Sequence, residues 1–171
     1  LHNPLAGKFS GDGVTDPEVG SATVANVVFY LRTLKPPAPR NEDDPDVQAG
    51  KELFSDIGCA GCHVPQLSTG DSDIDVLANK TFFPYTDLLL HDMGEELSDH
   101  YPEGEATGKE WRTTPLWGLG LIKDTIGGVP YFLHDGRTSD LTEVIRLHGG
   151  ESAISRGAFM ALSDEEQSQI I

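Results

Sequence analysis

Residues 59–63 read Cys59-Ala60-Gly61-Cys62-His63, and this short stretch decides how the rest of the chain is interpreted. Cys59 and Cys62 are the chain's two cysteines. Two cysteines separated by two residues and followed at once by histidine are typical of covalent c-type haem attachment. The thiols would form thioethers with the two vinyl groups at one edge of the porphyrin, and the imidazole of His63 would bind the iron beneath the ring. The sequence therefore predicts one covalent haem c.

Other uses of the two cysteines explain the stretch less well. A structural zinc site requires four ligands, and the chain has no second cysteine pair. A thioredoxin-like redox pair belongs in a βαβ pattern, which the residues around Cys59 do not show. A disulfide fits the spacing but leaves His63 without a role. Haem c is attached outside the bacterial cytoplasm, so we expect an exported, periplasmic protein with no free thiol.

The composition is that of a globular domain with an acidic surface. The chain has 171 residues, of which 37% are hydrophobic and 23% charged, and its formal net charge is −16. Such a charge argues against a general nucleic-acid-binding surface and favours basic proteins or cations as partners. No apolar run reaches the length of a membrane span. Because the chain begins at Leu1 and ends at Ile171 within an expected helix, we expect a fragment of a longer protein.

Capping signals and apolar spacing predict several helices. The first covers residues 17–34 behind Asp16, and the second runs from Asp44 to about residue 57, where Gly58 ends it. Further helices are expected over residues 85–93, over 139–148 and from Ser163 onward, where a capping box occurs. We therefore expect an all-α, cytochrome c-like fold with long loops at residues 64–84 and 94–132. The haem would occupy a crevice between the second helix, the 139–148 helix and the last helix.

A second axial ligand must be found elsewhere in the chain. On the helix expected at 139–148, Leu141, Val144, Ile145 and His148 share one face, so His148 would point into the core. A core imidazole requires a partner, which iron or a backbone carbonyl would supply. Met93 is the main alternative, because His/Met ligation is common in small cytochromes c.

Four further stretches show a resemblance when read with the haem motif. They are residues 85–94 (Tyr-Thr-Asp-Leu-Leu-Leu-His-Asp-Met-Gly), 112–116 (Arg-Thr-Thr-Pro-Leu), 132–137 (Phe-Leu-His-Asp-Gly-Arg) and 148–151 (His-Gly-Gly-Glu). Their order resembles the C-terminal half of the bacterial di-haem cytochrome c peroxidase superfamily, and most closely the branch labelled di-haem oxidoreductase or "thiol oxidoreductase". The resemblance covers roughly residues 45–171. It implies that residues 1–40 are the terminal helix and linker of a preceding haem domain, and that residues 41–171 form a cytochrome c-type domain.

The resemblance also bears on the site residues. In the family, the distal ligand of this haem lies 14 residues after the histidine of the F-x-H-x-G turn, and 14 residues after His134 is His148. The family has Met or Tyr there, so His148 departs from its pattern and implies a bis-histidine iron of lower potential. Arg112 would pair with a haem propionate, or lie on the surface. Trp117 and Trp111 would pack on the ring or in the core.

Two functions are open from the sequence. The first is electron transfer: a small redox carrier protein would exchange electrons with this haem, which would pass them to the N-terminal haem domain of the same chain. In that case this part of the chain has no catalytic residue, and the haem does the redox chemistry. The second is a peroxidase-type site here, with a weak or absent sixth ligand and His134 or His91 as acid–base groups. Leu53 and Phe54 would line the haem in either case.

Overall fold

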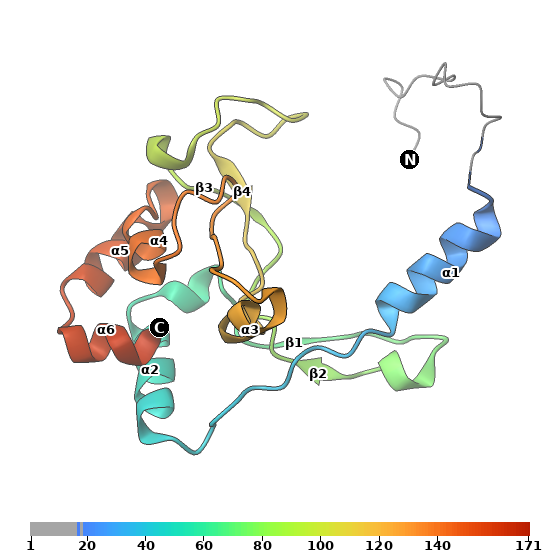
Figure 1. The fold of residues 1–171 in the computed structure, drawn as a ribbon, viewed down its shortest axis with the longest axis horizontal. Helices are drawn as coiled ribbons and strands as arrows, with labels where there is room; N and C mark the ends of the chain where they lie inside the picture. Colours follow the sequence, from blue (N-terminus) through green and yellow to red (C-terminus); the bar gives the residue numbers. More distant parts are fainter. Residues whose placement is uncertain (1–16, 18) are drawn as a thin grey trace. The chain divides into compact units, whose positions relative to one another are not determined.

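The computed structural model describes residue 17 and residues 19–171 (Figure 1). Contacts divide the chain into two compact units, Leu1–Lys35 and Pro36–Ile171. In the first unit, helix α1 spans Ser21–Arg32 and buries no residue. It begins four residues later than expected, with Gly20 at its N-cap, and the proposed cap Asp16 lies outside the described residues. The assignment of residues 1–40 to a preceding haem domain stays a prediction.

The second unit opens with the helix that leads to the haem motif. Helix α2 spans Pro45–Asp56, and the side chain of Asp44 accepts a hydrogen bond from the Asp46 N–H at 2.9 Å. Gly58 follows with a φ of 89°, a left-handed conformation that favours glycine and ends the helix. The 3-10 turn η1 then spans Cys59–Gly61. The predicted cap, helix and glycine stop are therefore confirmed, because each depends on neighbouring residues alone.

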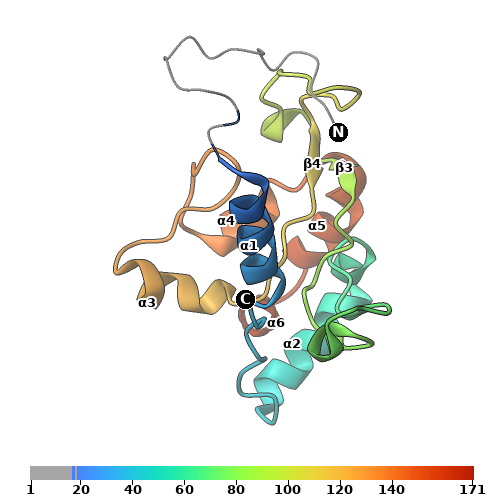
Figure 2. The ribbon, with the colours of Figure 1, turned by 90° about the vertical axis from the view of Figure 1, so that its right-hand side faces the viewer.

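The C-terminal helix packs directly on α2. Helix α6 spans Asp164–Ile170 and begins with the predicted capping box between Ser163 and Glu166. A Cβ placed on Gly50 of α2 would lie 1.9 Å from the carbonyl oxygen of Gln169, so the two backbones meet with no room for a side chain. α2 and α6 lie side by side in Figures 1 and 2.

The helix expected over residues 139–148 is shorter than expected, and two further elements that were not predicted follow it. Helix α4 spans Leu141–Arg146, the 3-10 turn η5 spans Gly150–Ser152, and helix α5 spans Ala153–Met160. Asp140 caps α4 as predicted. The expectation that this helix continues through His148 is wrong. The His148 N–H bonds to the carbonyl three residues before it, at 3.1 Å, so the chain tightens after Arg146 and leaves the α-helical path.

Two small antiparallel sheets make the fold mixed α/β, and the all-α prediction is wrong. About 42% of the structure is helical and about 9% is strand. Strand β1 (Leu67–Ser68) pairs with β2 (Thr81–Phe82), and β3 (Leu90–Asp92) pairs with β4 (Glu110–Arg112). The first two strands fall in the predicted 64–84 loop.

The predicted helix over residues 85–93 is strand β3 with an irregular lead-in. Tyr85 and Leu88 have positive φ values of 54° and 61°, which a right-handed helix does not contain. A short apolar run such as Leu88–Leu90 fits a strand as well as a helix, so its periodicity cannot decide. The run forms a strand because β4, some twenty residues later in the chain, pairs with it through backbone hydrogen bonds.

The remaining elements are single turns within loops, and the protein core is small. They are η2 (Asp75–Leu77), η3 (Glu95–Leu97), η4 (Leu119–Leu121) and helix α3 (Ile122–Ile126). Among the described residues, the buried large apolar side chains are Leu97, Leu147 and Phe159. No helix in the described part of the chain has the length and apolar character needed to cross a membrane.

Candidate functional site

The two cysteines lie in the tight turn that α2 leads into. Cys59 opens η1, and Cys62 is its last, capping residue. Both thiols are free and half-buried. Burial raises the pKa of each thiol, and the negative charges of Asp87 and Glu151 raise that of Cys62 further. The His63 N–H donates to the Cys59 carbonyl at 3.0 Å, so the turn carries the histidine on the same compact loop as the thiols.

The ring of His63 is oriented by one backbone hydrogen bond. Its Nδ1 lies 3.0 Å from the carbonyl oxygen of Tyr85, so the neutral ring donates through Nδ1 and leaves Nε2 free to accept a metal. Burial lowers the pKa of His63, and the Tyr85 hydrogen bond offsets this in part. Neutral imidazole is the form that ligates iron. Phe54 packs near both rings, with centroids 6.3 Å from His63 and 5.8 Å from Tyr85.

The ring of His148 repeats the same arrangement just beyond α4. Its Nδ1 lies 2.8 Å from the Val144 carbonyl oxygen, which again leaves Nε2 available. The ring is half-buried, and burial lowers its pKa. The charge of His148 also contributes to lowering the pKa of His63. The turn after α4, rather than the helix face used in the sequence argument, orients this histidine.

One segment, residues 85–94, touches both histidine-bearing regions. At its start, the Thr86 and Asp87 N–H groups donate to the carbonyls of Val64 and Cys62, at 3.0 and 2.9 Å. At its end, the Met93 carbonyl accepts from the Gly149 N–H at 3.1 Å. The segment therefore bridges the haem motif and the loop after His148.

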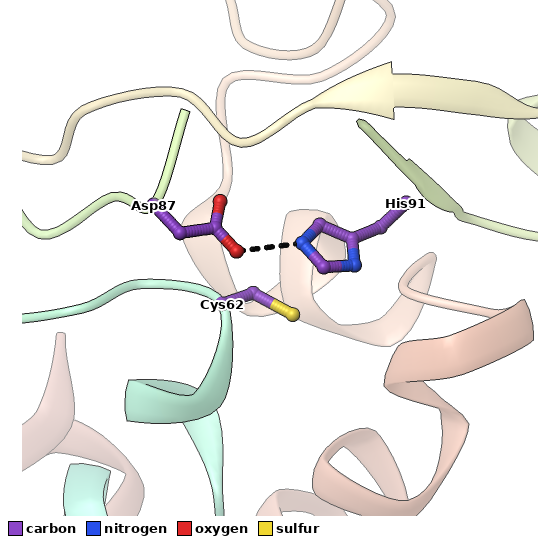
Figure 3. Close-up of side chains that lie close together, drawn as sticks. All are labelled: Cys62, Asp87 and His91. Carbon is purple, nitrogen blue, oxygen red and sulfur yellow. Dashed lines mark hydrogen bonds and ion pairs between the residues drawn. The ribbon is translucent and has the colours of Figure 1, made fainter. Parts of the chain in front are cut away.

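Asp87, His91 and Glu151 form a chain of hydrogen bonds beside Cys62, and Figure 3 shows the Asp87–His91 part of it. His91 Nε2 lies 2.8 Å from a carboxylate oxygen of Asp87, and His91 Nδ1 lies 2.8 Å from a carboxylate oxygen of Glu151. These hydrogen bonds raise the pKa of His91, with that from Glu151 the larger cause. The Cys62 sulfur, an Asp87 oxygen and a His91 nitrogen all lie within 4.8 Å of one another.

The pKa values of the two carboxylates in this group shift downward, opposite to that of His91. Burial alone would raise the pKa of Asp87, but hydrogen bonds from the Leu89 N–H and from His91 lower it overall. The exposed Glu151 has its pKa lowered by His91 and by the Asp92 N–H. All three shifts favour an imidazolium between two carboxylates.

The other predicted site residues lie around these groups without one shared role. Arg112 is exposed in β4 and donates to the carbonyl of Leu88. Trp117 is 38% exposed, and its ring centroid lies 6.1 Å from that of Phe82. The Met93 sulfur lies 4.0 Å from the Ser152 hydroxyl, next to the His148 loop. Their roles toward a haem stay predictions.

Trp111 and His134 form a pair that the sequence did not suggest. Their rings stack with centroids 3.8 Å apart and planes 11° apart, and the Trp111 indole donates to the Leu97 carbonyl at 2.8 Å. The sequence also gave no reason to join Asp87 and Glu151 to His91. The i, i+4 spacing of Asp87 and His91 was a signal for half of that group, but Glu151 lies 60 residues away.

The residues present fit a c-type haem. Two thiols and a histidine occupy one tight turn, and a second imidazole, whose Nδ1 hydrogen bond leaves Nε2 available, lies on a loop that residues 85–94 join to that turn. Exposed leucines adjoin the group: Leu88, Leu89 and Leu90 are 48%, 60% and 43% exposed. Such apolar side chains suit the face of a large ring.

A comparison with protein families shows to which family the chain belongs. A family model described as "Di-haem oxidoreductase, putative peroxidase" matches residues 7–171. No match is found among curated proteins or among solved structures. The chain therefore belongs to the di-haem oxidoreductase family, a haem-binding family, and the resemblance inferred from the motifs is confirmed.

Proposed function

Because the chain belongs to a family of di-haem oxidoreductases, we propose that it carries one haem c on Cys59 and Cys62 and transfers single electrons through it. His63 and His148 would be the two axial ligands. The bound haem supplies an iron that alternates between the ferric and ferrous states. The chain would hold the ring, orient both imidazoles and keep water from the iron.

The paired arrangement of His63 and His148 carries this proposal. Each ring is half-buried and donates Nδ1 to a backbone carbonyl, and residues 85–94 hydrogen-bond to the chain beside both histidines, at Cys62 and at Gly149. An Nδ1–H hydrogen bond fixes the tautomer that ligates through Nε2. Two such imidazoles would both hold the iron and leave no place on it for a small molecule, which suits electron transfer.

The peroxidase-type alternative has less support from the same geometry. It requires an acid–base group with a free nitrogen on the open side of the iron. Both ring nitrogens of His91 are engaged by carboxylates, and His134 is stacked on Trp111. Electron transfer is therefore the function that we propose for this part of the chain.

The partners and location follow from the same proposal. We propose an exported, periplasmic protein, because haem c is attached outside the bacterial cytoplasm. The second haem of a di-haem oxidoreductase would belong to a domain that precedes residue 41. A small carrier protein would exchange electrons here, and the net charge of −16 favours a carrier with a basic surface.

The test is spectroscopy of the chain matured in the periplasm of a host that attaches haem c. The wild-type ferric protein should be low-spin in optical and electron paramagnetic resonance spectra. The His148→Ala variant should become largely high-spin and bind cyanide, whereas Met93→Ala should leave the spectrum low-spin. A high-spin wild-type spectrum, or loss of the low-spin signal in Met93→Ala alone, would contradict the proposed ligation.

A further inference from the structure

We propose that Asp87, His91 and Glu151 are positioning residues that hold the two ligand-bearing segments together and so keep the iron closed to external ligands. We call these three residues the His91 clamp. The inference rests on the proposed bis-histidine ligation and names what maintains it. According to this inference, the clamp determines whether the haem only transfers electrons or can also bind an external ligand.

The Asp87 end of the clamp is anchored to the proximal side. The Asp87 N–H donates to the Cys62 carbonyl at 2.9 Å, next to His63 in the chain. Two residues before Asp87, the Tyr85 carbonyl accepts the hydrogen bond from His63 Nδ1. Movement of Asp87 would therefore disturb the carbonyl that orients the proximal ring.

Buried threonines hold this end in place. Thr86 is 1% exposed, and its hydroxyl donates to the Thr113 carbonyl at 2.7 Å while accepting from the Leu88 N–H at 2.9 Å. The lead-in to β3 is thus fastened to the chain beyond β4. Asp87 presents its carboxylate from a fixed backbone.

The Glu151 end is anchored to the distal side, three residues after His148. One carboxylate oxygen of Glu151 accepts from His91 at 2.8 Å, and the other accepts from the Asp92 N–H at 3.1 Å. Glu151 thereby joins the loop after the distal ligand to both the side chain and the backbone of β3.

Glycines let the same two segments approach backbone to backbone. A Cβ on Gly150 would lie 2.1 Å from the Asp92 carbonyl oxygen, and one on Gly94 would lie 2.8 Å from the Gly150 nitrogen. Glu151 can therefore reach His91 because the neighbouring backbones approach too closely for a side chain to lie between them. The clamp and the glycine contact act on the same junction.

His91 joins the two ends because both of its ring nitrogens are used. Its side chain is 16% exposed and that of Asp87 is 13% exposed, so the hydrogen bond between them is largely shielded from water, whereas the side chain of Glu151 is 56% exposed. Charge-assisted hydrogen bonds in such surroundings are among the stronger ones in proteins. The ring also lies beside the Cys62 sulfur, the atom through which the haem would be attached (Figure 3).

The experiment compares cyanide binding by haem-bearing variants in stopped flow. His91→Leu removes both donors, and Glu151→Gln, at an exposed position, keeps one acceptor while removing the charge. Loss of groups that orient a metal ligand typically changes metal affinity or activity by roughly tenfold to a hundredfold. We expect cyanide binding to accelerate by about that factor in His91→Leu and by less in Glu151→Gln, with a matching rise of the high-spin signal.

Two controls separate positioning from general destabilisation. His100→Gln removes another histidine that lies near a carboxylate, Glu95 at 3.9 Å, but far more exposed. Glu143→Gln removes the partner of Arg146 on α4, before the distal loop. Both should leave the cyanide rate unchanged, and thermal unfolding of all variants should be recorded alongside.

The outcomes distinguish this inference from the function it rests on. A low-spin wild type whose cyanide rate is unchanged in His91→Leu and Glu151→Gln overturns the clamp and leaves the bis-histidine proposal standing. A wild type that is already high-spin overturns both. Equal acceleration in the His100→Gln control would also overturn the clamp, because the effect would not be specific to its residues.

Discussion

Two regions meet at the candidate site and are built in opposite ways. Residues 44–63 form their structure from neighbours in the chain: a capping aspartate, a helix, a left-handed glycine and the cysteine turn. Residues 85–94 and 148–152 are instead ordered by each other, through β3, the glycine contact and the His91 clamp. The proposed proximal ligand, His63, therefore lies on a locally formed segment, whereas the position of the proposed distal ligand, His148, depends on contacts across some sixty residues.

The largest expected effect lies in the local region. Cys62→Ser should leave the haem on a single thioether or lose it, because the remaining cysteine reaches one vinyl group. Mass spectrometry of periplasmically matured protein measures the attached haem directly. A wild-type chain without a haem-sized increase in mass would contradict the assignment of the motif, and Cys59→Ser serves as the paired variant.

The next effect tests the long-range region through its glycine contact. Gly150→Ala places a methyl group 2.1 Å from the Asp92 carbonyl oxygen, at a residue whose φ is +49°. Left-handed strain alone costs about 1–2 kcal/mol, and forcing an extra methyl into a packed contact adds roughly 1–3 kcal/mol. Denaturant unfolding measures the sum.

The matched control for this prediction is Gly104→Ala. Gly104 also has a positive φ, of 64°, but a Cβ there meets nothing within 4 Å. It should therefore show the strain cost alone and leave the haem spectrum unchanged. Equal destabilisation by the two variants would show that the junction at Gly150 is not closely packed.

A smaller effect should come from removing a helix cap in the local region. Asp44→Ala deletes the acceptor for the Asp46 N–H at the start of α2, which costs about 1 kcal/mol. Because the cap is distant from the distal loop, cyanide binding should stay at its wild-type rate. A changed rate of cyanide binding in Asp44→Ala would contradict the claim that the cap of α2 does not affect the distal loop.

The smallest expected effect is a pH dependence of the His91 clamp. The pKa of His91 is raised above its ordinary value of 6.5, so its contribution is complete below pH 6.5 and is lost as the pH rises through the folded-state pKa. The pKa of Glu151 is lowered below 4.5, so its contribution is present above pH 4.5 and is lost at lower pH. The clamp should therefore stabilise the protein most between about pH 4.5 and 6.5.

Thermal unfolding of the wild type and His91→Gln across this range measures that dependence. The difference between them should be greatest between pH 4.5 and 6.5 and should shrink on either side, because the variant lacks the titrating ring. A difference that is constant with pH would show that His91 contributes packing rather than charge.

The errors in predicting the fold have one physical origin. The α2 cap, the Gly58 stop and the α6 capping box were all predicted, because a cap satisfies backbone groups within three residues. Residues 85–93 were predicted as a helix and form β3, because strand pairing with β4 is a long-range choice that a short apolar run does not reveal. The same limit produced the all-α prediction.

The sequence by itself indicated the C-x-x-C-H motif, the helix that leads to it, and His148 or Met93 as the distal ligand. Only the tertiary structure decided what the loop beside His148 contacts, because the Gly149 N–H donates to the carbonyl of Met93, far away in the sequence. It also decided the environment of His91, since Asp87 lies one helical turn away in sequence but Glu151 lies 60 residues away. Local hydrogen bonds can be read from neighbouring residues, whereas the junction between β3 and the distal loop forms only because Gly94, Gly149 and Gly150 let two backbones meet.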